Sequence, residues 1–292
     1  MDKELLDKLE ERLAKGEISE ETYKEIKARY ESKDEIEVEE PEDEEMEELE
    51  DVEMEEGGKK TKKVTLTGAS KIEGCNCEYF KSAGASKIEG NMKADEARIH
   101  GATKVTGDAK IGLLDSSGSI KVNGKTNADQ MNLSGASKFM NIVDAKKIDS
   151  SGATKFMEDV KSDEFISSGS MKAEKNIDAK TFTAAGAFVI QGTLKANEIM
   201  LKPGGKCEIG KIHGGDVLVE TGSGGFFSFG KSGSLKVDEV KGDDIYLENT
   251  RAKLVEGDNV KIGPGCKIEK VRAKSLKVHE SSSIDKKETL NE

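Results

Sequence analysis

The 292-residue sequence contains no tryptophan, only 4% aromatic and 34% hydrophobic residues, and 36% charged residues. In an ordinary globular domain so little apolar material would favour disorder. The low aromatic content also argues against the aromatic-lined groove that a polysaccharide lyase needs. A chain built of repeats can still fold with so few apolar residues, because each repeat needs few inward residues and stacking joins them into a continuous core.

Apolar runs and catalytic motifs are also scarce. The chain opens MDKELL and has no apolar run that resembles a signal peptide or could span a bilayer, so the expected compartment is the cytoplasm. His100, His213 and His279 are too far apart in the repeats described below to converge on one site. There is no glycine-lysine phosphate-binding motif, and basic and aromatic residues do not interleave as in nucleic-acid platforms. The sequence predicts neither an enzyme nor a specific nucleic-acid binder, and it indicates no cofactor.

Cysteine is equally sparse, with Cys75, Cys77, Cys207 and Cys266. Each occupies an inward position of the repeat pattern, where free cysteine behaves as a small hydrophobic residue. Cys75 and Cys77 could instead bind a metal ion, but no second cysteine or histidine pair lies nearby in the sequence to complete four ligands. Core packing is the favoured interpretation.

What the sequence does contain is a short pattern that recurs at a nearly constant interval between residues 64 and 203. It reads GASKIEG at Gly68 and Gly84 and GATKVTG at Gly101. The later copies are GSIKVNG, GASKFMN, GATKFME, GSMKAEK and GAFVIQG, which begin at Gly118, Gly135, Gly152, Gly169 and Gly186. The period is 17 from Gly84 onward, and the first interval is shorter by a single position. Self-similarity at a fixed period indicates stacked structural repeats.

Each repeat carries three pairs of apolar or small residues, and the members of a pair are two residues apart. In the repeat that begins at Gly101, the pairs are Thr103 and Val105, Ala109 and Ile111, and Leu114 and Ser116. Since alternate residues of a strand point the same way, each pair is the inward face of a short strand. Three strands per repeat predict an all-β, triangular β-solenoid, or β-helix. The glycines at the first and often the seventh position suit corners that need positive φ.

Beyond Gly204 the period loosens, but the paired pattern continues as far as Val278. The segments Gly222–Gly230 (GSGGFFSFG) and 249–263 (NTRAKLVEGDNVKIG) have the length to supply one further turn each. About thirteen turns at roughly 4.8 Å each would give a rod about 60 Å long. The predicted solenoid covers residues 64–284, and residues 285–292 are expected to form a polar tail.

The N-terminal residues differ from the repeats. In residues 1–31, Leu6, Leu9 and Leu13 recur at helical spacing and Gly16 is placed to end the helix, which predicts a small α-helical hairpin. The stretch LLDKLEERLAKGEISEETYKEIKARY resembles the SHOCT module. That resemblance implies a helical hairpin used for oligomerisation or tethering.

Residues 32–63 are expected to form an acidic disordered linker that ends in the basic patch KKTKK. Residues 34–56 carry 16 Asp or Glu and no Lys or Arg, and such a run repels itself and stays solvated. Residues 1–56 hold 8 basic and 26 acidic side chains, a net charge of −18, so residues 57–292 have a net charge of +6 within the total of −12. The chain therefore joins an acidic head to a mildly basic rod.

The fourth residue of each of the first seven repeats is a lysine. These residues are Lys71, Lys87, Lys104, Lys121, Lys138, Lys155 and Lys172. Stacking would align them in one column roughly 5 Å apart, at a cost of about 1 kcal/mol per neighbouring pair when solvated. The column is either a tolerated, solubilising face or an anion-binding stripe. Its anion would be a partner or the chain's own residues 34–56.

The recurring G-[AS]-x-K-[IV]-x-G, followed by Ala-Asp at Ala94 and Ala128, resembles the bactofilins, which are polymer-forming bacterial cytoskeletal proteins. The resemblance covers residues 64–203 well and 204–284 loosely. It implies a right-handed β-helix and nucleotide-independent, head-to-tail filaments that serve as scaffolds. A usual bactofilin core has about half as many turns, and many members carry an apolar N-terminal membrane-targeting segment that this sequence lacks. Filament geometry and membrane contact therefore stay open.

The sequence thus predicts a cytoplasmic structural protein that assembles end to end. The physical reason is that an uncapped solenoid ends in unpaired strand edges, which template another chain. The edges expected to meet carry Val64 and Leu66 at one end and Leu276, Val278 and Ile284 at the other. The alternative is a non-polymerising binding module that presents the lysine column to an anionic partner.

Overall fold

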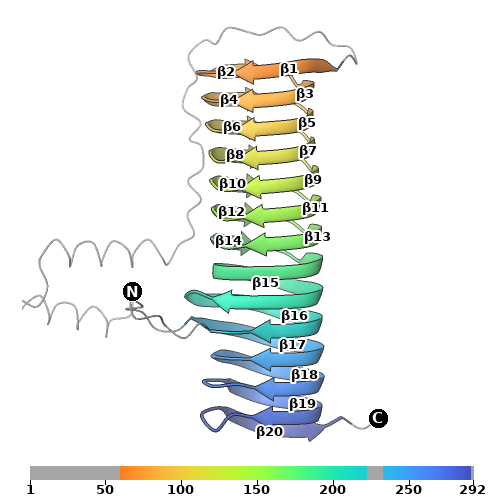
Figure 1. Cartoon of the computed structure of the whole chain (residues 1–292), viewed down its shortest axis with the longest axis vertical. Helices are drawn as coiled ribbons and strands as arrows, with labels where there is room; N and C mark the ends of the chain where they lie inside the picture. Colours follow the sequence, from red (N-terminus) through yellow and green to blue (C-terminus); the bar gives the residue numbers. More distant parts are fainter. Residues whose placement is uncertain (1–59, 222–232, 291–292) are drawn as a thin grey trace, which may run out of the picture. The chain divides into compact units, whose positions relative to one another are not determined.

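The computed structural model describes residues 60–221 and 233–290, which belong to one compact unit of the chain. These residues form a parallel β-solenoid of about 13 turns (Figure 1). No helix occurs in this part of the chain. The predicted helical hairpin, residues 1–31, and all but the end of the predicted linker, residues 32–63, lie outside the described residues.

In the first part of the solenoid each turn contributes one short and one longer strand. The short strands are β2 (Ser70–Ile72), β4 (Ala85–Ile88), β6 (Ala102–Val105), β8 (Ser119–Val122), β10 (Ala136–Phe139), β12 (Ala153–Phe156) and β14 (Ser170–Ala173). The longer strands are β1 (Thr61–Leu66), β3 (Cys75–Ser82), β5 (Met92–Ile99), β7 (Ala109–Ser116), β9 (Thr126–Leu133), β11 (Val143–Ser150) and β13 (Val160–Ser167). Later strands run on through corners, and they are β15 (Ile177–Pro203), β16 (Lys206–Val219), β17 (Ser234–Leu247), β18 (Thr250–Ile262), β19 (Lys267–Val278) and β20 (Ser283–Thr289).

The strands extend beyond the predicted limits of the solenoid. β1 begins at Thr61 rather than at residue 64, and β20 ends at Thr289 rather than at residue 284. The predicted polar tail, residues 285–292, is therefore strand as far as Thr289. Its polar composition concealed this, because a terminal strand has a neighbour on one side only and buries little.

The ladder places equivalent residues of successive turns side by side. Phe80 of β3 pairs with Ala97 of β5, and the same regular step continues from turn to turn as far as β15. Between β16 and β17 the step is much longer, since Cys207 pairs with Leu235. β16 and β17 pair directly, and the segment Gly222–Gly230, from which a further turn was predicted, lies outside the described residues. The turn predicted from residues 249–263 is confirmed as β18.

Burial alternates along the strands in the predicted pairs. In β5 the buried residues are Met92, Ala94, Ala97 and Ile99, and two consecutive residues that are not buried separate the second from the third. That interruption marks the boundary between the second and third predicted strands, which the structure joins into one longer strand. With the pair from the short strand, each regular turn has three inward pairs.

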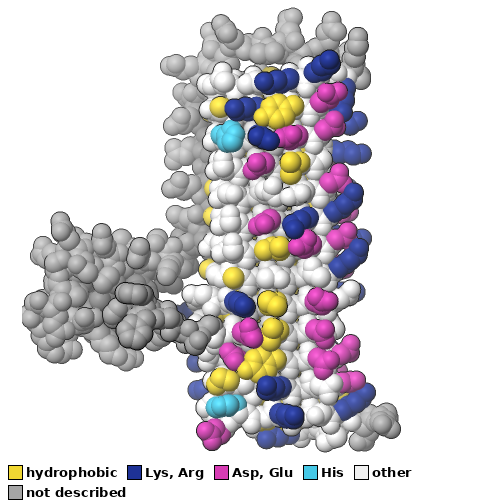
Figure 2. Space-filling view, in the orientation of Figure 1, with side chains coloured by type: hydrophobic (Ala, Val, Ile, Leu, Met, Phe, Trp, Pro, Cys, Tyr) yellow, Lys and Arg dark blue, Asp and Glu magenta, His cyan; other side chains and the backbone are white. Residues whose placement is uncertain are grey.

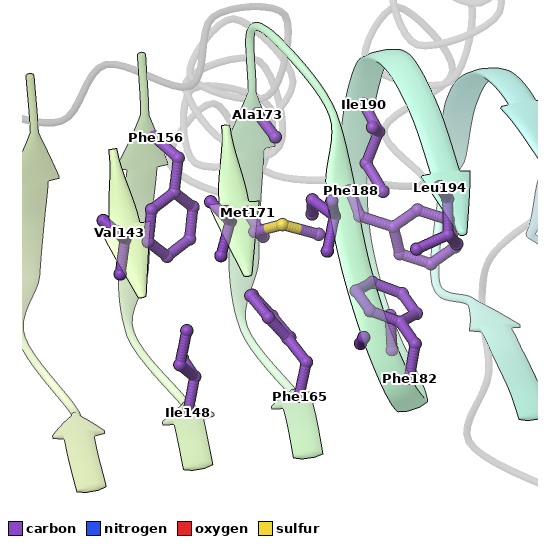
Figure 3. Packing of buried hydrophobic residues seen from close by; sticks show 14 of the residues in the cluster. Val143, Ile148, Phe156, Phe165, Met171, Ala173, Phe182, Phe188, Ile190 and Leu194 are labelled. Carbon is purple, nitrogen blue, oxygen red and sulfur yellow. The ribbon is translucent and has the colours of Figure 1, made fainter. Parts of the chain in front are cut away.

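The core of the middle turns is aromatic (Figure 3). Phe139 stacks on Phe156 with ring centroids 5.5 Å apart, and Phe156 meets Phe165 edge-on at 5.9 Å. Phe165 also contacts Phe182, with centroids 5.1 Å apart. All four rings are buried. An inward column is therefore a continuous seam in which a side chain packs on its equivalent one turn away.

The four cysteines are buried, as the core interpretation predicted. Cys75 and Cys77 lie with their sulfur atoms 3.2 Å apart, and their hydrogen bond raises the pKa of the Cys75 thiol. Burial raises the pKa of Cys207 and of Cys266. Among residues 60–221 and 233–290, no three His, Cys, Asp or Glu side chains gather in a metal-binding cluster.

Most glycines at the first position of the repeats have a different cause from the predicted positive φ, whereas Gly74 and Gly90 at the seventh position do have positive φ. Only Gly68 and Gly186 among the first glycines of the repeats have positive φ. At Gly135, which lacks positive φ, an added Cβ would lie 1.9 Å from the carbonyl oxygen of Gly118 one turn earlier. Close approach of stacked corners, rather than left-handed backbone, explains most of this column.

A ladder of side-chain amides and carboxylates closes another corner. Asn91 Oδ1 accepts the backbone N–H of Asp108, and Asp108 Oδ1 accepts that of Lys125, both at 2.8 Å. Each acceptor thus satisfies a backbone donor of the following turn. Lys125 and Ile142, whose side chains cannot accept a hydrogen bond, interrupt this ladder, and it resumes where Asp159 Oδ1 accepts the N–H of Asn176 at 3.1 Å.

Candidate functional site

The lysine column predicted from the repeats lies on successive short strands. Each lysine pairs in register with the next, from Lys71 of β2 through to Lys172 of β14. At about 4.8 Å per turn, the six steps cover roughly 30 Å. The structure shows the alignment, while the ligand of the column stays a prediction.

Carboxylates lie at both ends of the column. Glu89 lies 2.9 Å from Lys87 and 3.1 Å from Lys71, and Glu174 lies 2.9 Å from Lys172. Hydrogen bonds from these lysines lower the pKa of both carboxyl groups. The ends of the column are therefore locally neutralised.

Near the middle of the column, burial and the charge of Lys155 lower the pKa of Lys138. Both causes disfavour the charged ammonium group, and an anion placed beside it would offset them.

The C-terminal end of the solenoid has an open strand edge. β20 pairs only with Lys267–Ala273 of β19, so beyond Ala273 β19 has β18 as its sole partner among the described residues. Val278 is 37% exposed, whereas Ile262 one turn earlier is buried. Leu276 and Ile284 are partly buried against the core. The three interface residues predicted at this end thus lie on the last strands.

The hydrogen-bonding groups of this edge point outward. His279 donates its N–H to the carbonyl oxygen of Ile262 at 2.8 Å. Successive residues of a strand direct their N–H and C=O groups to opposite neighbours, so those of Val278 point away from β18. They form the kind of edge that accepts another strand.

At the N-terminal end, β1 pairs only with β3 among the described strands. The side chains of Val64 and Leu66 are 7% and 3% exposed, so they offer little apolar surface. Ala83 donates its N–H to the carbonyl of Leu66 at 3.0 Å, and Thr65 therefore directs its backbone groups to the open side. The predicted residues at this end would act through the backbone of their strand.

The first and the last strand begin and end at matching positions around the turn of the solenoid. Thr289, at the end of β20, pairs with Ala273, and Thr61, at the start of β1, pairs with Cys77. Ala273 and Cys77 occupy the same inward column of the ladder. The last strand thus ends in the column where the first begins.

The histidines occupy separate turns. His100 hydrogen-bonds to Ser117, whereas His213 lies 2.8 Å from Glu239 and His279 contacts a neighbouring serine. The structure does not bring any two of them together. Within residues 60–221 and 233–290, no helix has the length and apolar character needed to cross a membrane.

A surface that the sequence reasoning missed lies on three consecutive turns. Each turn presents a carboxylate and, two residues later, an outward apolar side chain. We call these residues the C-terminal patch, and they are Glu198 and Met200 of β15, Asp216 and Leu218 of β16, and Asp244 and Tyr246 of β17. The signal was the recurrence of E-I-M, D-V-L and D-I-Y, which the longer and unequal steps between these turns conceal from a search at period 17.

Comparison with known proteins gives a partial match. No family model matches the chain, and no solved structure matches it significantly. A stretch of 79 residues is 42% identical to the uncharacterized protein YhbF of Bacillus subtilis (strain 168), over 26% of this chain and 32% of that protein. The matched stretch spans about a third of the length of that relative.

Proposed function

We propose that this protein is a structural scaffold of the bactofilin type that assembles head to tail into nucleotide-independent polymers. The main observation behind the proposal is that the last strand, β20, ends in the same inward column of residues in which the first strand, β1, begins. A contact that repeats without closing produces a filament. The repeated G-[AS]-x-K-[IV]-x-G pattern supports the family resemblance.

The backbone groups of the two edges also match. Inside the solenoid, the carbonyl of Ile262 accepts the N–H of His279 in the following turn. In a head-to-tail contact, the carbonyl of Val278 would accept the N–H of Thr67 of a second copy in the same way. The side chain of Val278 would then be covered by Val64 and Leu66, and its exposed apolar area would be removed from water.

The finer features belong to the same proposal. They are a right-handed, triangular solenoid, a SHOCT-like hairpin in residues 1–31, a cytoplasmic location and a structural, non-enzymatic role. The hairpin would tether or cross-link the polymers, with residues 32–63 as its spacer. Contact with a membrane is not part of the proposal.

The test uses the open edge. Val278→Pro removes an N–H that makes no bond within the described residues, so the fold should be retained while the edge is blocked. Val278→Thr keeps the N–H and the branched shape and is the matched control. Electron microscopy and sedimentation of the full chain should show filaments for the natural sequence and the threonine variant, and short rods for the proline variant. Filaments of unchanged length in the proline variant would refute this contact.

Polarity is tested by cysteine cross-linking. Thr65 and Lys277 lie outward in the same column at opposite ends, so a head-to-tail contact would bring their Cα atoms about 5 Å apart, within disulfide range. The double variant Thr65→Cys, Lys277→Cys should give ladders of cross-linked multimers. Lys277→Cys alone should not cross-link. Efficient dimers of that single variant would indicate tail-to-tail contact and would overturn the head-to-tail arrangement.

The alternative is a non-polymerising module that presents the lysine column to an anionic partner. The register of seven lysines in consecutive turns favours it. Such a module should bind heparin at low salt, and Lys121→Ser should weaken that binding more than Lys206→Ser, outside the column. Deleting residues 34–56 should strengthen binding if this acidic run competes for the column. Isolated rods in micrographs together with column-dependent heparin binding would favour this function over polymerisation.

A further inference from the structure

The C-terminal patch combines two parallel ladders on one face of the solenoid. In register, Met200 pairs with Leu218, and Leu218 pairs with Tyr246. Apolar side chains follow this face of the lower turns in Figure 2. Met200 is 40% exposed, which is unusual for a large hydrophobic residue of this rod. The apolar ladder is therefore available to a partner.

The second ladder is acidic and uncompensated. Glu198 pairs in register with Asp216, and Asp216 pairs with Asp244, so three carboxylates lie about 4.8 Å apart. None of them forms an ion pair with another described residue. Glu164, in the same outward position closer to the N-terminus, has Lys147 at 3.0 Å. Like charges in adjacent strands repel each other, and a cationic partner would relieve that repulsion.

The patch continues into a shallow groove of about 410 Å³. Its lining includes Asp216 and Asp244, Leu218 and Tyr246, and, from the following turns, Lys261 and Lys277. Tyr246 is held in place, because Lys261 lies over its ring at 5.0 Å and its hydroxyl donates to Glu248. The groove therefore has a fixed aromatic wall next to acidic groups.

We propose that the C-terminal patch binds an amphipathic helix that carries lysine or arginine along one flank of its apolar stripe. Side chains at successive turns of an α-helix are about 5.4 Å apart along the axis, close to the roughly 4.8 Å step of the ladders. A helix laid along the solenoid axis can thus place three successive apolar residues on Met200, Leu218 and Tyr246. Basic residues beside them would meet the three carboxylates.

The charge of the patch selects this partner over others. Nucleic acids and anionic lipid surfaces would be repelled by Glu198, Asp216 and Asp244. A second copy that paired identical patches about a two-fold axis across the rods would bring these carboxylates together. The inference uses a side face of the solenoid and does not depend on assembly through its ends.

The test measures binding of a fluorescein-labelled helical peptide about four turns long by fluorescence anisotropy. Its leucines recur every three or four positions and its lysines follow one flank of the leucine stripe, while a shuffled peptide of equal composition is the control. Against the full chain, Asp216→Lys and Leu218→Ser should each weaken binding about tenfold or more. The matched variants Asp144→Lys and Ile142→Ser change an exposed carboxylate and an exposed apolar residue elsewhere, and they should bind as the natural chain does.

The location is tested with a photoreactive leucine in the same peptide. Cross-links should map to β15, β16 and β17 by mass spectrometry, and circular dichroism should show that all variants keep the β fold. Equal binding of the shuffled peptide, equal weakening by the matched variants, or cross-links elsewhere would overturn the proposal. So would a chain that does not bind the peptide but loses self-association in Leu218→Ser, because that result would assign the patch to a second copy.

Discussion

Replacing Gly135 with alanine should destabilise the solenoid through a steric contact between turns. An added Cβ would lie 1.9 Å from the carbonyl oxygen of Gly118, and real Cβ atoms essentially never come closer than 3.0 Å, so the corner must open by about 1.1 Å. The N–H of Ala136 donates to that same oxygen at 3.1 Å and would lose this bond. The lost hydrogen bond costs about 0.5–1.5 kcal/mol and overpacking about 1–3 kcal/mol. The expected loss of unfolding free energy is therefore about 1.5–4.5 kcal/mol.

Alanine substitutions at two other glycines distinguish the steric contact between turns from the effect of backbone conformation. Gly68 has φ +69° with nothing within 4 Å of an added Cβ, so Gly68→Ala should cost about 1–2 kcal/mol from conformation alone. Gly205 also has open space and lacks positive φ, and Gly205→Ala should be neutral or stabilise by up to about 1 kcal/mol. The three variants thus differ in one physical factor at a time.

The assay is denaturant unfolding followed by far-ultraviolet circular dichroism, with all variants in one background such as Val278→Pro to exclude effects of assembly. Midpoints should fall in the order Gly205→Ala, Gly68→Ala, Gly135→Ala, with similar slopes. If Gly68→Ala proves the most destabilising, or if Gly135→Ala matches Gly205→Ala, close approach is not the reason for the glycine column.

Three further predictions concern the core and the last turn. Phe156→Ala should lower the unfolding free energy by about 3–5 kcal/mol in the same assay, because the ring is buried between two others; a loss below about 1 kcal/mol would contradict this packing. Thr103→Val should stabilise by about 1–2 kcal/mol, because its buried hydroxyl has no hydrogen-bond partner among the described residues, and Thr103→Ser is the control. Hydrogen bonds from Lys286, Lys270 and Arg272 lower the pKa of Glu288 to about 2. The folding stability that this carboxylate contributes is therefore fully present above its ordinary pKa and is lost as the pH falls towards 2. Melting temperatures between pH 5 and pH 2 should fall less steeply for Glu288→Gln than for the natural chain, and parallel curves would refute this role.

The regular turns were predictable because one period governs them. A column such as Phe139, Phe156 and Ala173 can be read from the sequence, since a constant step places its members in register. The same pattern located the buried cysteines and the seven aligned lysines. It did not give the reason for the glycines, because contact between stacked corners and positive φ both select glycine.

The irregular turns were harder to predict because the step itself varies. The stretch from Cys207 to Leu235 could hold one turn with an insertion or nearly two turns, and composition does not distinguish these. The C-terminal patch stayed hidden for the same reason, since Asp216 and Asp244 are equivalent only once the register is known. The open edge at Val278 likewise depends on where β20 ends, and its polar sequence did not show that.

The proposed interaction surfaces of the solenoid differ in the strands that carry them and in their charge. The lysine column lies on the short strands β2 to β14, whereas the C-terminal patch lies on β15, β16 and β17, and the open edges are at the two ends. A head-to-tail polymer would repeat the basic column and the acidic patch once per rod, at an interval of about 60 Å. Neither surface would contribute to a head-to-tail contact, so blocking the edge at Val278 should leave peptide binding intact. Reversing the charge of Asp216 should leave the polymers intact. Polymer assembly through the ends and helix binding at the C-terminal patch would then be independent properties of one fold. The reason is that a stack of nearly identical turns can vary its outward residues while its inward columns stay fixed.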